Sequence, residues 1–118
     1  TGWRKDNFSV FYSGLDSFDA AICSGIKKNL DGMFSCTPAT SKQMYECMNN
    51  GSYSDIPSLL NNILLLRNIF LKGNVFSAYS YAMELLGCPG LYHPDYEEEA
   101  SEYLKQAIYT RMKAMKEI

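Results

Sequence analysis

Few residues in this chain combine the types and the spacing that catalysis requires. His93 is the only histidine, and it stands two positions before Asp95, which could in principle form an acid–base pair with it. Pro94 and a capping Asp95 are equally the start signal of a helix. A Cys–His nucleophile would need a free thiol, and the chain contains neither a glycine-rich phosphate loop nor an H-E-x-x-H zinc motif. The sequence therefore predicts no catalytic residue and a protein that is not an enzyme.

An acidic cluster around the same segment could attract a cation. Its members are Asp95, Glu97, Glu98, Glu99 and Glu102. Consecutive carboxylates on a helix point about 100° apart, so they do not converge on one metal ion. In the first turn of a helix they would instead interact favourably with the helix dipole. We therefore predict no metal site and no cofactor.

Four cysteines stand at positions 23, 36, 47 and 88, and their spacing matches no zinc or redox motif. An even number of cysteines in a small chain is typical of a secreted domain with two disulfides. If the first two predicted helices form an antiparallel hairpin, Cys23 and Cys47 lie level across it, which favours Cys23–Cys47 with Cys36–Cys88. The pairing Cys23–Cys36 with Cys47–Cys88 stays open. Cys36–Cys47 is disfavoured because one helix would hold these residues ~16 Å apart.

Two N-glycosylation sequons point to the same compartment. They are Asn7-Phe8-Ser9 and Asn50-Gly51-Ser52. The second follows Asn49 in a strong turn signal, which predicts a surface position for Asn50. We therefore expect a secreted, glycosylated protein. The alternative is an intracellular protein with four reduced, buried cysteines.

Aromatic and methionine residues suggest what such a protein could bind. The chain has nine Tyr, six Phe, one Trp and six Met. A tyrosine can pack its ring and offer its hydroxyl to a partner, and methionine adapts to irregular cavities. This content suits a cavity for a hydrophobic small molecule or lipid, although an ordinary core would use the same residues. The predicted lining is Phe76, Tyr79, Met83, Tyr103, Ile108 and Met112, with one or two Tyr hydroxyls or Arg67 holding the polar end of the ligand.

Helices must position these side chains. Apolar residues recur every three or four positions between Phe11 and Met33, which predicts a first helix with one apolar stripe. Thr37 and Pro38 are the cap and first residue of a second helix that runs to Asn49. If the Thr37 side chain is the cap, Thr37→Ser should be nearly neutral.

Similar start and stop signals predict three further helices. They run from Ser54 or Asp55 to Gly73, from Asn74 to Gly87, and from Asp95 to about Met115. No segment alternates apolar and polar residues for long enough to predict a strand. The sequence therefore predicts an all-α fold: a compact bundle of about five helices, stabilised by two disulfides.

Composition limits the remaining possibilities. The chain has 118 residues, of which 47% are hydrophobic, so we expect residues 1–118 to form a single helical domain. A net charge of −2 gives no electrostatic help to nucleic-acid binding, and no apolar run approaches the ~18 residues of a membrane span. The oligomeric state is not indicated.

Two functions remain as hypotheses. The first is a secreted protein that binds a hydrophobic small molecule or lipid between its helices. The alternative is a secreted protein–protein interaction module (an effector, ligand or structural domain) without a ligand cavity. A closed cavity above roughly 300 Å³ would favour the first, and a filled core would favour the second.

Overall fold

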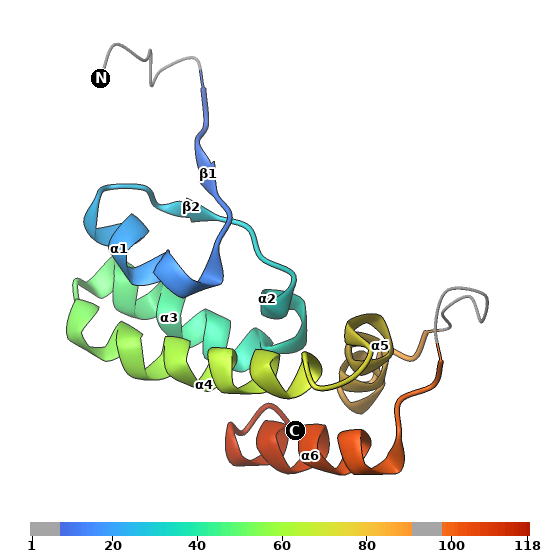
Figure 1. Ribbon diagram of the computed structural model, residues 1–118. Coiled ribbons are helices and arrows are strands. Elements are labelled where there is room, and N and C mark those ends of the chain that lie inside the picture. Colours follow the sequence, from blue (N-terminus) through green and yellow to red (C-terminus); the bar gives the residue numbers. More distant parts are fainter. Residues whose placement is uncertain (1–7, 91–97) are drawn as a thin grey trace.

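The computed structural model describes residues 8–90 and 98–118, and most of them are helical, as expected (Figure 1). Two 3₁₀ turns, Leu15–Ser17 and Tyr53–Asp55, precede helices. The elements in chain order are β1 (Phe11–Tyr12), α1 (Phe18–Cys23), β2 (Lys28–Asn29), α2 (Met33–Cys36), α3 (Pro38–Asn50), α4 (Ile56–Phe70), α5 (Val75–Leu85) and α6 (Glu102–Ala114).

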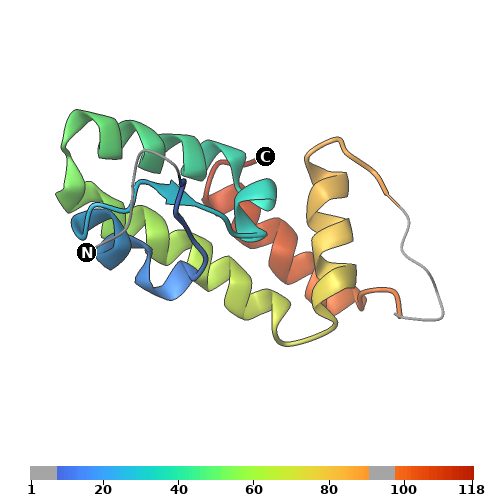
Figure 2. The same cartoon turned by 90° about the horizontal axis from the view of Figure 1, so that it is seen from above.

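The helices pack around α4, the longest of them. α3 and α4 form an antiparallel pair, α1 and α2 cover one side of it, and α6 lies along the other side of α4 (Figures 1 and 2). α5 crosses the end of this arrangement and contacts α4 and α6. The core side chains are Leu15, Phe18, Ile22, Met33, Cys36, Met44, Ile56, Leu60, Ile63, Leu66, Phe70, Ala78, Ala82, Ala100, Leu104, Ile108 and Met112.

The predicted first helix is wrong in its extent. Two glycines interrupt it: Gly14 has a φ of 152° and Gly25 a φ of 90°, which a side chain would strain. Between them only a 3₁₀ turn and the six residues of α1 are helical. Phe11, at the start of the predicted stripe, and Leu30, near its end, are exposed to solvent. Helical spacing of apolar residues therefore continued past the point where the backbone leaves the helix.

A short β-ribbon, which the sequence did not predict, occupies part of that segment. β1 and β2 pair in parallel, with Phe11 opposite Lys28 and Tyr12 opposite Asn29. The Leu30 amide donates to the Tyr12 carbonyl at 3.0 Å and extends the ladder. In Figure 1, β1 projects away from the helices.

α3 begins at Pro38 with Thr37 in the N-cap position, as predicted, but the Thr37 side chain makes no capping hydrogen bond. The Thr37 hydroxyl is buried and donates to the Met33 carbonyl at 2.8 Å. The carboxylate of Glu117 accepts from the Ala39 amide at 3.0 Å and from the Thr40 amide at 2.8 Å. These are two of the amides that no helical carbonyl can reach, so Glu117 is the N-terminal cap of α3.

Glu117 reaches α3 because α6 ends in a tight turn. Lys116 has a φ of 62°, and the amides of Lys116 and Glu117 donate to the carbonyls of Lys113 and Met112, both at 3.0 Å. This is the Schellman pattern, here with a lysine in the left-handed position that glycine usually fills. The turn sends the chain back from α6 towards the start of α3.

The predictions for α4 and α5 agree better with the structure. α4 begins after Asp55, although no side chain caps it, and it ends at Phe70, before the predicted stop at Gly73. The Asn74 side chain caps α5 as expected and accepts from the amides of Phe76 and Ser77 at 3.0 and 3.3 Å. Gly87, with a φ of 88°, follows the end of α5.

α6 begins later than predicted. Ser101 is its cap and accepts from the Leu104 amide at 3.2 Å, so Glu98 and Glu99 precede the helix. The Ser77 hydroxyl donates to the Glu98 carbonyl and fixes this approach to α5. His93, Asp95 and Glu97 lie outside the described residues. In the described ranges, no group of three or more His, Cys, Asp or Glu side chains could hold a metal ion, and no helix is long and apolar enough to cross a bilayer.

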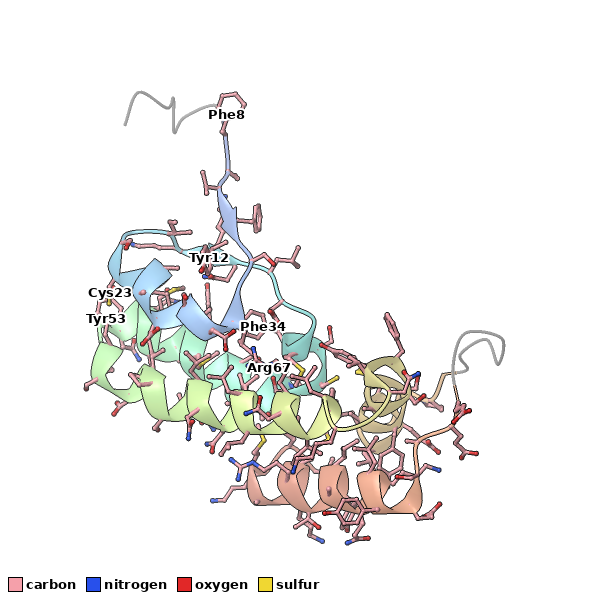
Figure 3. All side chains as sticks on the ribbon, in the orientation of Figure 1. Phe8, Tyr12, Cys23, Phe34, Tyr53 and Arg67 are labelled. Atoms are coloured by element: carbon pink, nitrogen blue, oxygen red, sulfur yellow. The ribbon has the colours of Figure 1, made fainter. Side chains whose placement is uncertain are left out.

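The structure does not confirm the disulfides, because all four cysteines are free. Cys36 is buried near Tyr79 on α5, whereas Cys88 is exposed beyond the far end of that helix. The two cysteines therefore lie towards opposite ends of α5, whereas a disulfide tolerates only ~7 Å between Cα atoms. Cys23 is exposed at the end of α1 (Figure 3), and Cys47 is half-buried in the last turns of α3.

Candidate functional site

The residues predicted to line a ligand cavity do not converge. Ile108 and Met112 are 0% exposed and belong to the core, whereas Phe76 and Tyr103 are 69% and 81% exposed. Tyr79 packs edge-on against Phe70 in the core, with ring centroids 5.1 Å apart. The predicted rows on α5 and α6 therefore combine positions that face in opposite directions.

Met83 and Arg67 do not line a ligand cavity either. Met83 is half-buried against the core. Arg67, on α4 (Figure 3), pairs with Asp16 at 2.9 Å between Nη2 and Oδ1. This arginine lowers the pKa of Asp16, chiefly by its hydrogen bond, and so it is already engaged by an acidic side chain.

Tyr103 does line a hollow, which is open to solvent. Two adjoining depressions of about 270 and 380 Å³ run between α4 and α6 and share Ile69, Tyr103 and Ala107. Charged and small side chains, including Lys72, Glu99, Arg111 and Ala114, form much of the rest of their walls. Both depressions are open to solvent, so neither is the closed cavity between helices that would favour a bound small molecule.

A smaller groove, with Lys27 as its one charged lining residue, lies away from α6. It has a volume of about 190 Å³ and is formed by α1, the segment leading into β2, α2 and α3. We call it the α3 groove. Its lining is Phe18, Lys27, Asn29, Phe34, Ser41, Met44, Tyr45 and Met48.

One face of α3 supplies half of this lining. Ser41, Met44, Tyr45 and Met48 follow the spacing i, i+3, i+4, i+7, which places them on one side of a helix. Met44 is buried, Met48 is half-buried, and Tyr45 is 60% exposed. The groove is therefore deepest at Met44 and open to solvent beside Tyr45.

Aromatic rings from the two short helices face this side of α3. Phe18 of α1 and Phe34 of α2 meet edge to face, with centroids 5.7 Å apart. Phe18 is buried, and Phe34 is half-buried against the core, on the body of the molecule (Figure 3). An edge-to-face pair is a well-defined aromatic geometry, so these rings form a firm wall opposite the flexible methionines.

Three polar groups complete the groove. Asn29 Oδ1 is buried and has no hydrogen-bond partner in the described part of the chain. The Ser41 hydroxyl lies 3.2 Å from the Thr37 hydroxyl, which is itself bonded to Met33. Lys27 is exposed and supplies a positive charge at the margin. The groove can therefore bury an apolar group, and an unpaired acceptor is buried in the side chain of one lining residue, Asn29.

Nucleophilic chemistry has no support in the geometry of Cys36. Burial, and secondarily the charge of Glu117, raise the pKa of the Cys36 thiol to about 12. Thiolates, not thiols, are nucleophiles, so this cysteine is inert at neutral pH. Burial likewise raises the pKa of Tyr79 to about 12.

Comparison with other proteins adds no family assignment. No protein-family model matches this chain, and neither a curated protein nor a solved structure shows significant similarity to it. The function must therefore be argued from the residues of this chain alone.

Sequence reasoning missed the α3 groove, although part of its signal was visible. The sequence shows the helical spacing of Met44, Tyr45 and Met48, but the same spacing is typical of an apolar helix face that packs into a core. The contributions of Lys27 and Asn29 were hidden, because the predicted first helix placed them inside a helix that does not form. No local pattern indicates that β2 would lie over α3.

Proposed function

We propose that this protein is a protein–protein interaction module that seats an apolar side chain of its partner in the α3 groove. The observation that carries this proposal is the size and lining of the groove. A volume of about 190 Å³ is below the ~300–1,000 Å³ of typical small-molecule pockets. It suits a single anchoring side chain, which is how most interfaces concentrate their binding energy.

The packing of the core supports the same proposal. Ile63, Leu66, Phe70, Ile108 and Met112, where α4 and α6 meet, are each 0% exposed. All the hollows reported above are open to solvent. The lack of a closed cavity among these hollows, in the part of the chain that the structure describes, is what we expect of an interaction module.

We further propose that the protein acts outside the cell and carries glycans. Asn50, the last residue of α3, is exposed and its sequon crosses the turn at Gly51, which suits an acceptor site. Asn7 lies outside the described residues. Treatment of protein from its natural source with an N-glycosidase should lower its mass, and an unchanged mass would remove the glycan part of the proposal.

A display selection with random short peptides tests the interaction function. Enriched peptides should bind the purified protein and shift the ¹³C-methyl NMR signals of Met44 and Met48, while those of Met83 and Met112 stay in place. Met48→Glu should abolish binding because it puts a charge into the groove. Met83 is also half-buried but lies on α5, outside the groove. Met83→Glu is therefore the matched control and should still bind the peptides.

The result that would overturn the proposal is equally concrete. Peptides that bind without moving the Met44 and Met48 signals, or a selection that enriches nothing, would remove the groove as a docking site.

A hydrophobic small molecule remains a second candidate occupant. The observation in its favour is the methionine-rich and aromatic lining of the groove, which suits apolar ligands of varied shape. Native mass spectrometry of protein from its natural source distinguishes the two. A stoichiometric lipid or other small molecule, bound so that Met48→Glu releases it, would favour a carrier over an interaction module.

A further inference from the structure

We propose that α6 mediates dimerisation by pairing antiparallel with α6 of a second copy of this chain. The proposal goes beyond the interaction function above, because it concerns another face of the molecule and another partner.

The first observation is an exposed ring beside a hollow. Tyr103 is 81% exposed, more than any other large hydrophobic side chain in the described residues. It helps to line the solvent-open depression of about 380 Å³ between α4 and α6. Tyrosine is among the side chains that most often anchor protein interfaces. A surface that carries a projecting ring and a hollow side by side suits a two-fold dimer, in which the ring of each copy meets the hollow of the other.

α6 presents the ring and the hollow on one face. It packs on α4 and α5, and its remaining side points away from the bundle (Figure 1). Four residues that line the depression have the spacing i, i+4, i+7 and i+11, which places them along one side of the helix. They are Tyr103, Ala107, Thr110 and Ala114, and we call them the α6 face. The three residues that follow Tyr103 on this face are small, so a second helix can approach closely there.

The charge of α6 changes sign along its length. Residues 98–105 carry three carboxylates and one lysine, Lys105, which pairs with two of the carboxylates at 2.7 and 3.8 Å. Residues 111–117 carry three basic side chains and one carboxylate, that of Glu117, which is bound to the amides of α3. Lys72 lies at the acidic end and offsets only part of the negative charge. The start of α6 is therefore negative and its end is positive.

These charges favour an antiparallel partner. The acidic start of each α6 then lies against the basic end of the other, whereas a parallel partner would bring like charges together. Opposite positions in an antiparallel pair have a constant sum, so a register that places Glu102 opposite Lys113 of the second copy also places Tyr103 opposite position 112. That position lies midway between Thr110 and Ala114 of the α6 face. Since Glu102 and Lys113 are both exposed, one register pairs the charges and seats the ring.

The expected dimer is weak and leaves the α3 groove free. α6 has 13 residues, so it is ~20 Å long. An interface centred on such a helix is small and belongs with transient complexes, which bury less than ~1,200 Å² in total. The α3 groove lies away from α6, so each dimer would present two of these grooves. A bivalent partner would then bind with avidity.

Sedimentation equilibrium of the full chain, from about 10 µM to about 1 mM, tests the association. We expect a reversible monomer–dimer equilibrium. Tyr103→Ala should weaken it by about tenfold or more, because each dimer loses the anchoring ring twice. Tyr53→Ala, at a tyrosine that is 43% exposed in the 3₁₀ turn before α4, is the matched control and should leave it unchanged. Both side chains are exposed, so both variants should fold, which circular dichroism checks.

Charge reversal tests the direction of the pairing. Glu102→Lys and Lys113→Glu should each weaken dimerisation, because like charges then meet at two places in an antiparallel dimer. Combining both substitutions in one chain should restore it, since each reversed residue again faces an opposite charge. Lys42→Glu and Glu46→Lys, at exposed positions on α3, are the controls and should leave dimerisation unchanged.

Three results would overturn the proposal. The first is a chain that stays monomeric up to about 1 mM. The second is a dimer that Tyr103→Ala and Tyr53→Ala weaken equally, and the third is a combined charge variant that dimerises no better than the single ones. None of these results concerns peptide binding in the α3 groove, so the interaction function stands or fails separately.

Discussion

Cys36 and Tyr79 lie close together in the interior, where α2 meets α5. Burial raises the pKa of both side chains, so both stay protonated to a higher pH than they would in water. The close packing there leaves little room: a Cβ at Gly32 would lie 2.8 Å from the Tyr79 hydroxyl oxygen. At this scale the chemistry of the side chains is set by burial. It follows that ionisation of these two groups affects stability only at alkaline pH.

Stability should therefore fall as the pH rises through the alkaline range. The ordinary pKa values of 9.0 for Cys36 and 10.0 for Tyr79 both rise to about 12 in the folded protein. The unfolded chain thus releases these protons first, so the free energy of unfolding is undiminished below about pH 9 and decreases towards pH 12. Urea denaturation at a series of pH values measures this, and Cys36→Ala should make the decrease shallower. An equally steep decrease in that variant would contradict the assignment.

Thr37 gives a second prediction at the residue scale. Its hydroxyl bonds the Met33 carbonyl, and the whole side chain is buried. Thr37→Ser keeps the hydroxyl but loses a buried methyl, so it should cost about 1 kcal/mol instead of being neutral. Thr37→Val should cost about 1–3 kcal/mol because the Met33 carbonyl loses its donor. Chemical denaturation compares the two variants, and a neutral Thr37→Ser would restore the capping role predicted from the sequence.

At the scale of the elements, the helix boundaries show which signals are local. The starts at Pro38 and Asn74 and the stop at Gly87 agree with prediction, because each depends on residues within one turn. The cap of α3 comes from Glu117, 78 residues from Ala39, and no local pattern can reveal it. The first helix failed for a different reason. Its apolar spacing was helical, but the positive φ angles at Gly14 and Gly25 end the helix on both sides.

The long-range cap makes a quantitative prediction. Glu117→Ala leaves the amides of Ala39 and Thr40 without their acceptor and should lower the free energy of unfolding by about 1–2 kcal/mol. Glu46→Ala, at an exposed position in the middle of α3, is the control and should change it by less than about 0.5 kcal/mol. Thermal or urea denaturation measures both, and equal effects would show that Glu117 does not act as a cap.

At the scale of the whole molecule, the bundle is elongated. It measures 49 × 31 × 23 Å with a radius of gyration of 16.0 Å, against the roughly 13 Å expected of a compact chain of this length. The all-α class followed from periodicity alone. The α3 groove could not be predicted from periodicity, because its lining comes from α1, β2, α2 and α3 and depends on how these elements pack against one another.

Filling of the interior can be tested with Ala82→Trp. Ala82 is 0% exposed on α5, within the core, so an indole there would overpack its surroundings. We expect a loss of about 1–3 kcal/mol in the free energy of unfolding. Glu84→Trp, exposed on the same helix, should be close to neutral. A folded Ala82→Trp variant of unchanged stability would reveal a cavity that could accept a ligand.

The attachment of Glu117 to the start of α3 also has a consequence for the order in which this protein acquires its structure during synthesis. Thr40 and Glu117 are 77 residues apart, and a ribosome that adds about 5–20 residues per second needs roughly 4–15 s to cover that distance. Throughout that interval the first turn of α3 has emerged without the carboxylate that completes it. The first turn of α3 can therefore be completed only after Glu117 has been synthesised.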